Sequence, residues 1–416
     1  MSVTDQVIRL AQGWEGDGPV ELIRLCLFDW AAVAMAGQDE PVAQALAMQA
    51  GVEGDASVLG GGQTSAADAA LINGTTGHAL DYDDTHFDHI GHTSAVVMPA
   101  VLALAEDQMM PAMNRVLDAA LIGSEAAVRM GLWLGRDHYQ VGFHQTATSG
   151  AIGAAVAGAR FLRMDAAQTR HAIGLAATGA SGLKGQFGTM GKPLNAGLAA
   201  RCGVESVLWA QSGLTSDPDA LAQFGVTHHG VGDDSAWDVS EPWKVARVSH
   251  KFHACCHGLH AMLEALRGVE GDLAAVTVHT HPRWMSVCNK PAPQTGLETK
   301  FSYRMAAALA LSGRDTSDIM QFSDAAADDP AMHVLRDAVT VVADDNLTET
   351  QARVEVAFAD GRTDARTHDL AKPLTYEVRE TRLRNKARAL LGREAAALWE
   401  ACHAADIDDL TALMRG

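Results

Sequence analysis

The segment that most constrains this chain is a run of aspartates and histidines between two apolar stretches. It covers residues 78–92, HALDYDDTHFDHIGH, and contains four aspartates and four histidines within fifteen residues. Residues 69–72 before it and residues 96–104 after it are apolar and helical in character. Placing so many groups that give or take protons between two buried helices is costly, unless the groups are solvated or functional. We therefore interpret this segment as the rim of an active site.

The first half of the chain predicts helices. From about residue 19 to residue 213 the sequence is rich in alanine, and residues 21–35 carry apolar side chains at three- and four-residue spacing. Further helices are expected at residues 65–80, 117–134 and 145–162. The last of these repeats glycine and alanine at helical spacing, which favours close helix packing. A dinucleotide-binding role is not favoured, because the glycines do not follow a convincing strand.

After residue 213 the pattern changes. Residues 216–243 are polar and rich in turn formers, whereas residues 274–280 alternate like a strand. Residues 353–358 precede Asp360-Gly361, a pair that is typical of a strand entering a hairpin turn. The intervening residues 301–311 and 332–342 are partly helical in character. Together these patterns indicate a second, smaller α+β region.

The length of the chain predicts more than one domain. With 416 residues the chain is too long to fold around one ordinary hydrophobic core. Its 48% of hydrophobic residues is enough to bury a large apolar interior. We predict a mainly α protein with an all-helical domain over residues 1–267 and an α+β domain over residues 268–375. The helices expected at residues 376–416 would return to the first domain.

Charge and cysteine usage exclude several classes of protein. A net charge of −19 argues against nucleic acid or an anionic membrane as a partner, so an anionic substrate needs a local positive site. The six cysteines form no disulfide framework. The first residues lack the pattern of a signal peptide, and no window matches a membrane span. We expect a soluble, cytoplasmic protein.

Two residues outside the acidic segment carry candidate chemistry. Residues 182–197 are rich in glycine, and Pro193 opens a helix there, so this segment is either an anion site or a flexible loop. Lys192, just before Pro193, could pair with a substrate carboxylate or polarise a carbonyl group. His144 precedes the helix at residues 145–162, where the helix dipole would lower its pKa and favour the neutral base.

A second dense cluster is HKFHACCHGLH, residues 250–260, where a helix is expected from residue 255 to residue 267. His253 and His257 are four residues apart, as are Cys256 and His260, so each pair could share a helical face and bind a metal. No glutamate stands between the two histidines, as a zinc protease motif requires. Calcium is disfavoured at Asp81-x-Asp83, because the glycine and the terminal glutamate of a calcium loop are missing. A metal-dependent hydrolase built on residues 250–260 stays open as an alternative.

Four stretches resemble one known family. They are Asn73-Gly74 with His78, Asp81, Asp83, Asp84 and Thr85; Gly91-His92-Thr93-Ser94 with Pro99; Phe187-Gly188-Thr189-Met190 with Lys192-Pro193; and Lys251 with Cys256 and His260. In these stretches the chain resembles the MmgE/PrpD family, which includes 2-methylcitrate dehydratase, cis-aconitate decarboxylase and iminodisuccinate epimerase. Weaker matches lie at residues 142–144, 300–302 and 360–361, and all the matches occur along the chain in the same order as in the family.

The resemblance implies a large helical domain, a smaller α+β domain and a homodimer. It also implies an active site between the domains that needs neither metal nor organic cofactor. The residues that would be catalytic are Asp81, His92, His144 and Lys192. Those that would bind a small carboxylate substrate are Thr85, Lys251, Cys256, His257 and His260.

The sequence departs from the family where substrate is expected. The usual K-x-Y-P-x-C becomes KFHACC at residues 251–256, and the tyrosine of F-S-x-x-Y is replaced by Met305. The substrate of any one family member can therefore not be assigned to this chain. We predict a cofactor-independent lyase, a dehydratase of the 2-methylcitrate type, in which His92 or His144 abstracts a proton next to a carboxylate. An epimerase or a decarboxylase that uses the same residues is the alternative.

Overall fold

The structure is a computed structural model that describes residues 1–13, 18–51, 53–238 and 243–416. The chain divides into two compact units, of which the first comprises Met1–His250 and Leu391–Gly416, and the second Lys251–Leu390. Both contain more helix than strand, so the expected mainly α protein is confirmed. None of the helices in the described ranges combines the length and the apolar character that a membrane crossing requires.

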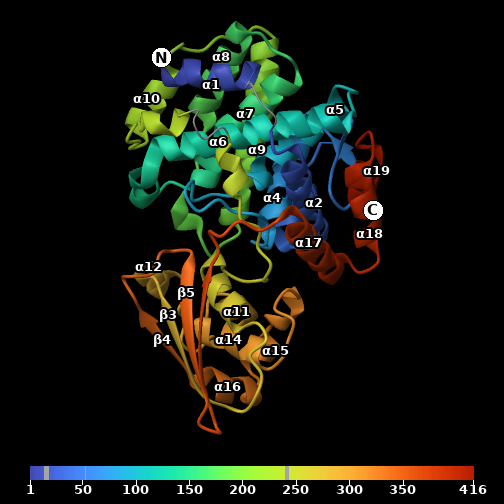
Figure 1. Cartoon of the computed structure of the whole chain (residues 1–416). Helices are drawn as coiled ribbons and strands as arrows, with labels where there is room; N and C mark the ends of the chain where they lie inside the picture. The colour runs from blue at the N-terminus through green and yellow to red at the C-terminus, as the bar shows by residue number, and fades with distance from the viewer. Residues whose placement is uncertain (14–17, 52, 239–242) are drawn as a thin grey trace. The chain divides into compact units, whose positions relative to one another are not determined.

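The first unit is built mainly from helices (Figure 1), and its described residues also form one very short hairpin. Its helices are α1 (Val3–Gln12), α2 (Val20–Ala36), α3 (Pro41–Ala47), α4 (Ala66–Ala79), α5 (Ser94–Asp107), α6 (Met113–Val141), α7 (Gln145–Phe161), α8 (Ala166–Gly179), α9 (Gly191–Gln211), α10 (Ala220–Thr227), α18 (Glu394–His403) and α19 (Asp408–Arg415). Short 3₁₀ turns are η1 (Lys184–Gln186), η2 (Asp234–Trp237) and η3 (Lys244–Arg247). The antiparallel hairpin pairs β1 (Ala56–Ser57) with β2 (Gln63–Thr64).

The core of the first unit forms where α4, α5, α6, α7 and α9 pack on one another. Nearly every side chain of α7 is buried, as expected for a helix of small residues surrounded by others. A Cβ atom at Gly153 of α7 would lie 2.6 Å from the Cβ atom of Ala127 in α6. The glycine therefore allows the two helix backbones to approach closely, which is the packing role that the sequence predicts.

The second unit combines a four-stranded sheet with short helices. Its elements are η4 (His257–Leu259), α11 (His260–Leu266), β3 (Leu273–Thr280), α12 (Pro282–Val287), α13 (Gly296–Thr299), α14 (Tyr303–Leu311), η5 (Ile319–Gln321), α15 (Asp324–Ala327), α16 (Pro330–Asp337), β4 (Val339–Ala343), β5 (Gln351–Phe358), β6 (Thr363–Asp369) and α17 (Tyr376–Leu391). The strand order is β4-β3-β5-β6; β3 and β4 are parallel, and the other pairs are antiparallel. Figure 1 shows α11, α14 and α16 on one face of this sheet.

Two local differences from the sequence analysis stand out in the second unit. The segment 332–342, expected to be partly helical, is helical only to Asp337 and continues as β4. Its Val-Thr-Val-Val run favours a strand, and pairing with β3 satisfies its backbone. The helix expected from residue 255 begins at His260, after the 3₁₀ turn η4.

The compact units also differ in extent from the predicted domains. Helix α11 lies in the second unit because it packs on β5, β6 and α14. Most of α17 belongs there too, and its Arg382 forms an ion pair with Glu264 of α11. The boundaries at residues 267 and 375 stay a prediction about domains. Of the polar segment predicted at 216–243, residues 239–242 lie outside the described residues.

Candidate active site

The acid–histidine segment, residues 80–93, connects α4 to α5 in the first unit. Two of its non-glycine residues, Asp81 and Ile90, have left-handed backbone conformations with φ of 50° and 57°. Such conformations cost of order 1–3 kcal/mol each and persist only where the surrounding structure imposes them. Hydrogen bonds supply part of that restraint: the His92 amide donates to Thr146 Oγ1 of α7 at 3.1 Å, and the His86 amide to the Gly91 carbonyl oxygen.

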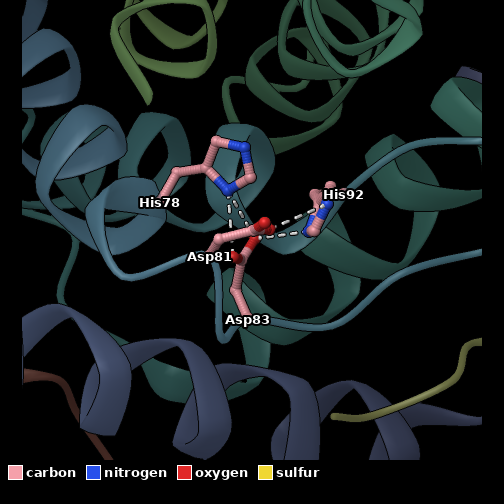
Figure 2. A group of neighbouring side chains, drawn as sticks. All are labelled: His78, Asp81, Asp83 and His92. Atoms are coloured by element: carbon pink, nitrogen blue, oxygen red, sulfur yellow. Dashed lines mark hydrogen bonds and ion pairs between the residues drawn. The ribbon is translucent and has the colours of Figure 1, made fainter. Parts of the chain in front are cut away.

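Four side chains converge in this segment and at the end of α4 (Figure 2). They are His78, Asp81, Asp83 and His92, whose ligand-type atoms lie within 4.8 Å of one another. His78 Nδ1 donates to the Asp83 carboxylate at 2.9 Å, and His92 Nδ1 lies 3.0 Å from the other oxygen of Asp83. His92 Nε2 lies 3.6 Å from Asp81 Oδ1. Asp83 is fully buried, whereas the side chain of His92 is 12% exposed and within reach of a ligand.

Lys192 and His144 join this cluster from distant parts of the chain. Lys192, at the start of α9, places Nζ 2.7 Å from Asp81 Oδ1. His144 is the residue before α7, and its ring stacks toward that of His78 at a centroid distance of 6.2 Å. The Asn195 amide lies 3.2 Å from His144 Nδ1 and fixes the orientation of the ring. Thus the structure brings together Asp81, His92, His144 and Lys192, while their catalytic roles stay a prediction.

Burial sets the protonation of the two candidate bases. It is the largest cause that lowers the pKa of His92 to about 4, against the raising effect of Asp83. Burial, followed by the charges of the neighbouring histidines and Lys192, also holds the pKa of His144 well below its ordinary value. The helix dipole that the sequence suggests is therefore not needed to explain a neutral His144. Both imidazoles are neutral bases near pH 7.

Asp83 has the opposite protonation behaviour. Burial alone would raise its pKa, but the neighbouring His78 and His92 outweigh burial and keep the pKa well below the ordinary value. An ionised Asp83 holds the proton of His78 on Nδ1. His78 Nε2 is buried and has no hydrogen-bond partner among the described residues. This nitrogen is a third candidate base.

Asp84 and Thr85 have structural contacts. Ser94 donates its hydroxyl and its amide to Asp84, which ties the segment to the start of α5. Burial raises the pKa of Asp84 to about 7, partly opposed by the hydrogen bond from Ser94. Thr85 exchanges backbone hydrogen bonds with Ser249, and its hydroxyl donates to the Ser249 carbonyl oxygen at 3.4 Å. A substrate-binding role for Thr85 stays a prediction.

Four further residues lie at this site without a role predicted from the sequence: His78, Asp83, Asn195 and Phe187. His78 and Asp83 are part of the densest polar segment, so their residue types were a usable signal. Asn195 is one helical turn after Lys192 on α9, a spacing that places both on one face. The Phe187 ring packs edge-on against His144 at 5.0 Å, and Lys192 Nζ lies 5.6 Å from its centroid. Nothing in its sequence context indicates that contact.

The remaining predicted site residues belong to the second unit. Lys251, His257 and His260 are buried there, and Cys256 is half-buried with its amide bonded to the Lys300 carbonyl oxygen. The rings of His257 and His260 lie 4.5 Å apart. Their substrate-binding roles stay predictions.

The geometry does not favour the metal hydrolase alternative. His253 precedes the helix and bonds Thr316 and Glu264, so it does not share a helical face with His257. In the described ranges, the groups of three or more donors that converge closely lie elsewhere, in the first unit. Residues 251–260 therefore lack the arrangement that a metal site requires, whereas His250 belongs to one of the donor groups of the first unit.

The buried neutral histidines predict a loss of stability in acid. His89, His92, His138 and His144 all have lowered pKa values, mainly because of burial. Between pH 6.5 and about 4 the unfolded chain binds protons at these four histidines that the folded chain does not, and the raised pKa of Asp84 opposes this at one site only, so stability falls as pH falls. Each histidine that is protonated in the unfolded chain and neutral in the folded chain lowers the free energy of unfolding by about 1.4 kcal/mol per pH unit. Thermal unfolding should show a midpoint that drops steeply from pH 7 to pH 5, with a shallower drop in His138→Gln; a flat profile would contradict this.

The helical unit with its acid–base cluster and the smaller α+β unit agree with one class of protein. The MmgE/PrpD N-terminal domain matches residues 17–236, and the MmgE/PrpD C-terminal domain matches residues 253–402. The chain belongs to the MmgE/PrpD family, as its motifs suggest.

Individual relatives are cis-aconitate decarboxylases or proteins resembling them. The chain is 27% identical to the cis-aconitate decarboxylase-like protein oryM of Aspergillus oryzae, over 84% of this chain and 82% of that protein. It is 26% identical to human cis-aconitate decarboxylase, over 78% of this chain and 73% of that enzyme. A cis-aconitate decarboxylase of Aspergillus terreus is 30% identical over 49% of this chain and 45% of that enzyme.

Proposed function

We propose that this chain is a cofactor-independent lyase that acts on a small di- or tricarboxylate by proton transfer at a carbon next to a carboxylate. The observation that carries the proposal is the placement of neutral imidazoles, His92 and His144, around the Asp81–Lys192 ion pair. Neutral imidazole is a general base near pH 7, and an ammonium group favours the negative charge that develops when a proton leaves such a carbon.

Each residue has a role in this proposal. Lys192 would bind a substrate carboxylate in place of, or together with, Asp81, and would stabilise enediolate-like charge by several kcal/mol. His92 or His144 would move the proton. Asp83 would hold the tautomers of His78 and His92 through its two oxygens. Thr85, Lys251, Cys256, His257 and His260 are proposed to bind substrate.

Two lyase reactions fit this set of residues. The sequence analysis places a dehydratase of the 2-methylcitrate type first. The names of the relatives support decarboxylation of a cis-aconitate-like acid as the first reaction to test. In that reaction the electrons of the broken C–C bond form the new double bond, the old double bond takes up a proton, and carbon dioxide leaves. Dehydration and epimerisation stay as alternatives because they use the same acid–base groups.

The test is a panel of carboxylates incubated with the enzyme in heavy water. The panel contains cis-aconitate, citrate, 2-methylcitrate and iminodisuccinate, followed by proton NMR and a carbon dioxide assay. We expect one acid to incorporate deuterium beside a carboxylate, and release of carbon dioxide or appearance of an alkene then distinguishes the reactions. If none of the acids exchanges or reacts, the proposal fails for this substrate class.

A homodimer is part of the proposal, from the family resemblance. Light scattering during size-exclusion chromatography should give twice the chain mass of 43.9 kDa. A mass that stays at one chain across the concentrations used for activity assays would contradict it.

A further inference from the structure

A second group of metal-ligating side chains lies in the first unit, apart from the acid–base residues. It consists of Cys26 of α2, Asp84 of the acid–histidine segment and His250, the last residue before the second unit. All three are at most 3% exposed, and their ligand-type atoms lie within 4.8 Å of one another. They are separated by 58 and 166 residues along the chain, so only the tertiary fold brings them together.

The distance between Cys26 and His250, which also allows a hydrogen bond, matches tetrahedral coordination. Zn²⁺ bonds are about 2.3 Å to cysteine sulfur and about 2.0–2.1 Å to histidine nitrogen. At a tetrahedral angle these bonds place the sulfur and nitrogen about 3.6 Å apart. Cys26 Sγ and His250 Nε2 are 3.6 Å apart. Thus these two ligands could bind Zn²⁺ with little movement.

The charge around Asp84 also favours a cation. Its carboxyl group accepts hydrogen bonds from Ser94 and Cys26, and the nearby charges are those of Asp29 and Asp83, both negative. Among the described residues no lysine or arginine forms an ion pair with Asp84. A divalent cation that replaces the protons of Asp84 and Cys26 would be balanced by one carboxylate and one thiolate.

The acid–base cluster, which comprises His78, Asp81, Asp83, His92, His144 and Lys192, is less suited to a metal ion. Its ligand-type atoms are all nitrogen and oxygen, and Lys192 already places an ammonium group 2.7 Å from Asp81. A second cation there would be repelled. A thiolate beside an imidazole, by contrast, favours zinc over magnesium or calcium.

We propose that Cys26, Asp84 and His250 bind one thiophilic divalent metal ion, with Zn²⁺ as the best fit, as a structural site. The ion joins α2, the acid–histidine segment and the end of the first unit, and so holds Asp81 and Asp83 in place. One coordination position is left for water or for the second oxygen of Asp84. Because all three ligands are buried, the ion is taken up as the chain folds.

The experiment uses the full chain, unfolded and stripped with a chelator, then refolded with increasing Zn²⁺ against a chromophoric competitor, and separately with Co²⁺. We expect one tightly bound ion per chain and a near-ultraviolet thiolate-to-Co²⁺ band. Loss of a supporting contact costs metal sites about 10–100-fold in affinity, so Cys26→Ser or His250→Gln should weaken binding at least about 100-fold and remove or alter the band. Circular dichroism verifies that each variant is folded. If Cys26→Ser does not fold, the test relies on His250→Gln.

Two cysteine variants act as matched controls. Cys402→Ser changes another buried cysteine of the first unit, and Cys256→Ser tests the other possible thiolate source near histidines. Both should retain one equivalent of metal with unchanged affinity. Undiminished binding in both Cys26→Ser and His250→Gln, loss of the band in Cys256→Ser instead, or the absence of stoichiometric binding in the unmodified chain would each overturn the proposal.

Discussion

His92→Gln should lower kcat by about 10²- to 10⁴-fold, the range that a general acid–base residue contributes. The imidazole of His92 contacts both Asp81 and Asp83, and it is partly exposed to a ligand. Glutamine keeps the approximate size and one polar group, but it cannot take up a proton near pH 7. If His92 moves the proton, deuterium exchange at the substrate carbon should fall by a similar factor. The KM should change much less, because Lys192 still binds the carboxylate.

The measurement compares kcat, KM and exchange rate in the unmodified chain, in His92→Gln and in His403→Gln. His403 is an exposed histidine of α18 and serves as the control. Circular dichroism and the thermal midpoint separate a catalytic loss from a folding defect. Exchange that stays within threefold in a folded His92→Gln would assign the base to His144 or His78 and remove His92 from the mechanism.

Glu125→Gln should destabilise the protein by about 3–5 kcal/mol, the usual cost of removing one partner from a buried ion pair. Glu125 and Arg129 are both completely buried on α6, with Arg129 Nε 2.6 Å from Glu125 Oε1. The same carboxylate also accepts the amides of Lys244 and Val245 at 3.0 Å and 2.7 Å. Glutamine removes the negative charge and turns an NH₂ group toward these donors, so at least one buried donor loses its acceptor.

This substitution should also affect activity indirectly. The segment that Glu125 holds continues to Ser249, which pairs with Thr85 in the acid–histidine segment, and the Lys244 carbonyl oxygen contacts His86 Nε2 at 2.9 Å. The matched control is Glu205→Gln, which breaks an Arg–Glu pair of the same four-residue spacing on α9 with side chains 38% and 26% exposed. Solvent screens that pair, so the control should lose less than about 1 kcal/mol. Denaturant unfolding measures both, and equal losses would refute the argument from burial.

Local periodicity predicted much of the fold. The helices α2, α4 and α7 and the strands β3 and β5 occur within a few residues of the expected positions. Strand β4 was missed because a short apolar run after a helix fits helix or strand equally well. Its parallel pairing with β3 involves residues more than sixty positions earlier in the chain, which no local pattern contains.

The candidate site was predictable in composition but not in arrangement. Asp81, Asp83 and Asp84 lie within four residues of the chain, and three such neighbours cannot all face one direction. Only the structure shows that Asp81 and Asp83 turn toward His92, whereas Asp84 turns toward Ser94. Asp81 has a left-handed backbone conformation, and such conformations are fixed by the contacts around a loop, not by the residue itself.

By itself, the sequence determined a mainly helical chain, membership in the MmgE/PrpD family and a set of acid–base residues, because periodicity and residue type are local properties. Only the tertiary structure decided that Lys192 meets Asp81, that His144 approaches His78, and that Cys26 and His250 enclose Asp84. Those contacts join segments up to 224 residues apart. They depend on how whole helices pack, and packing also sets the burial that keeps His92 and His144 neutral.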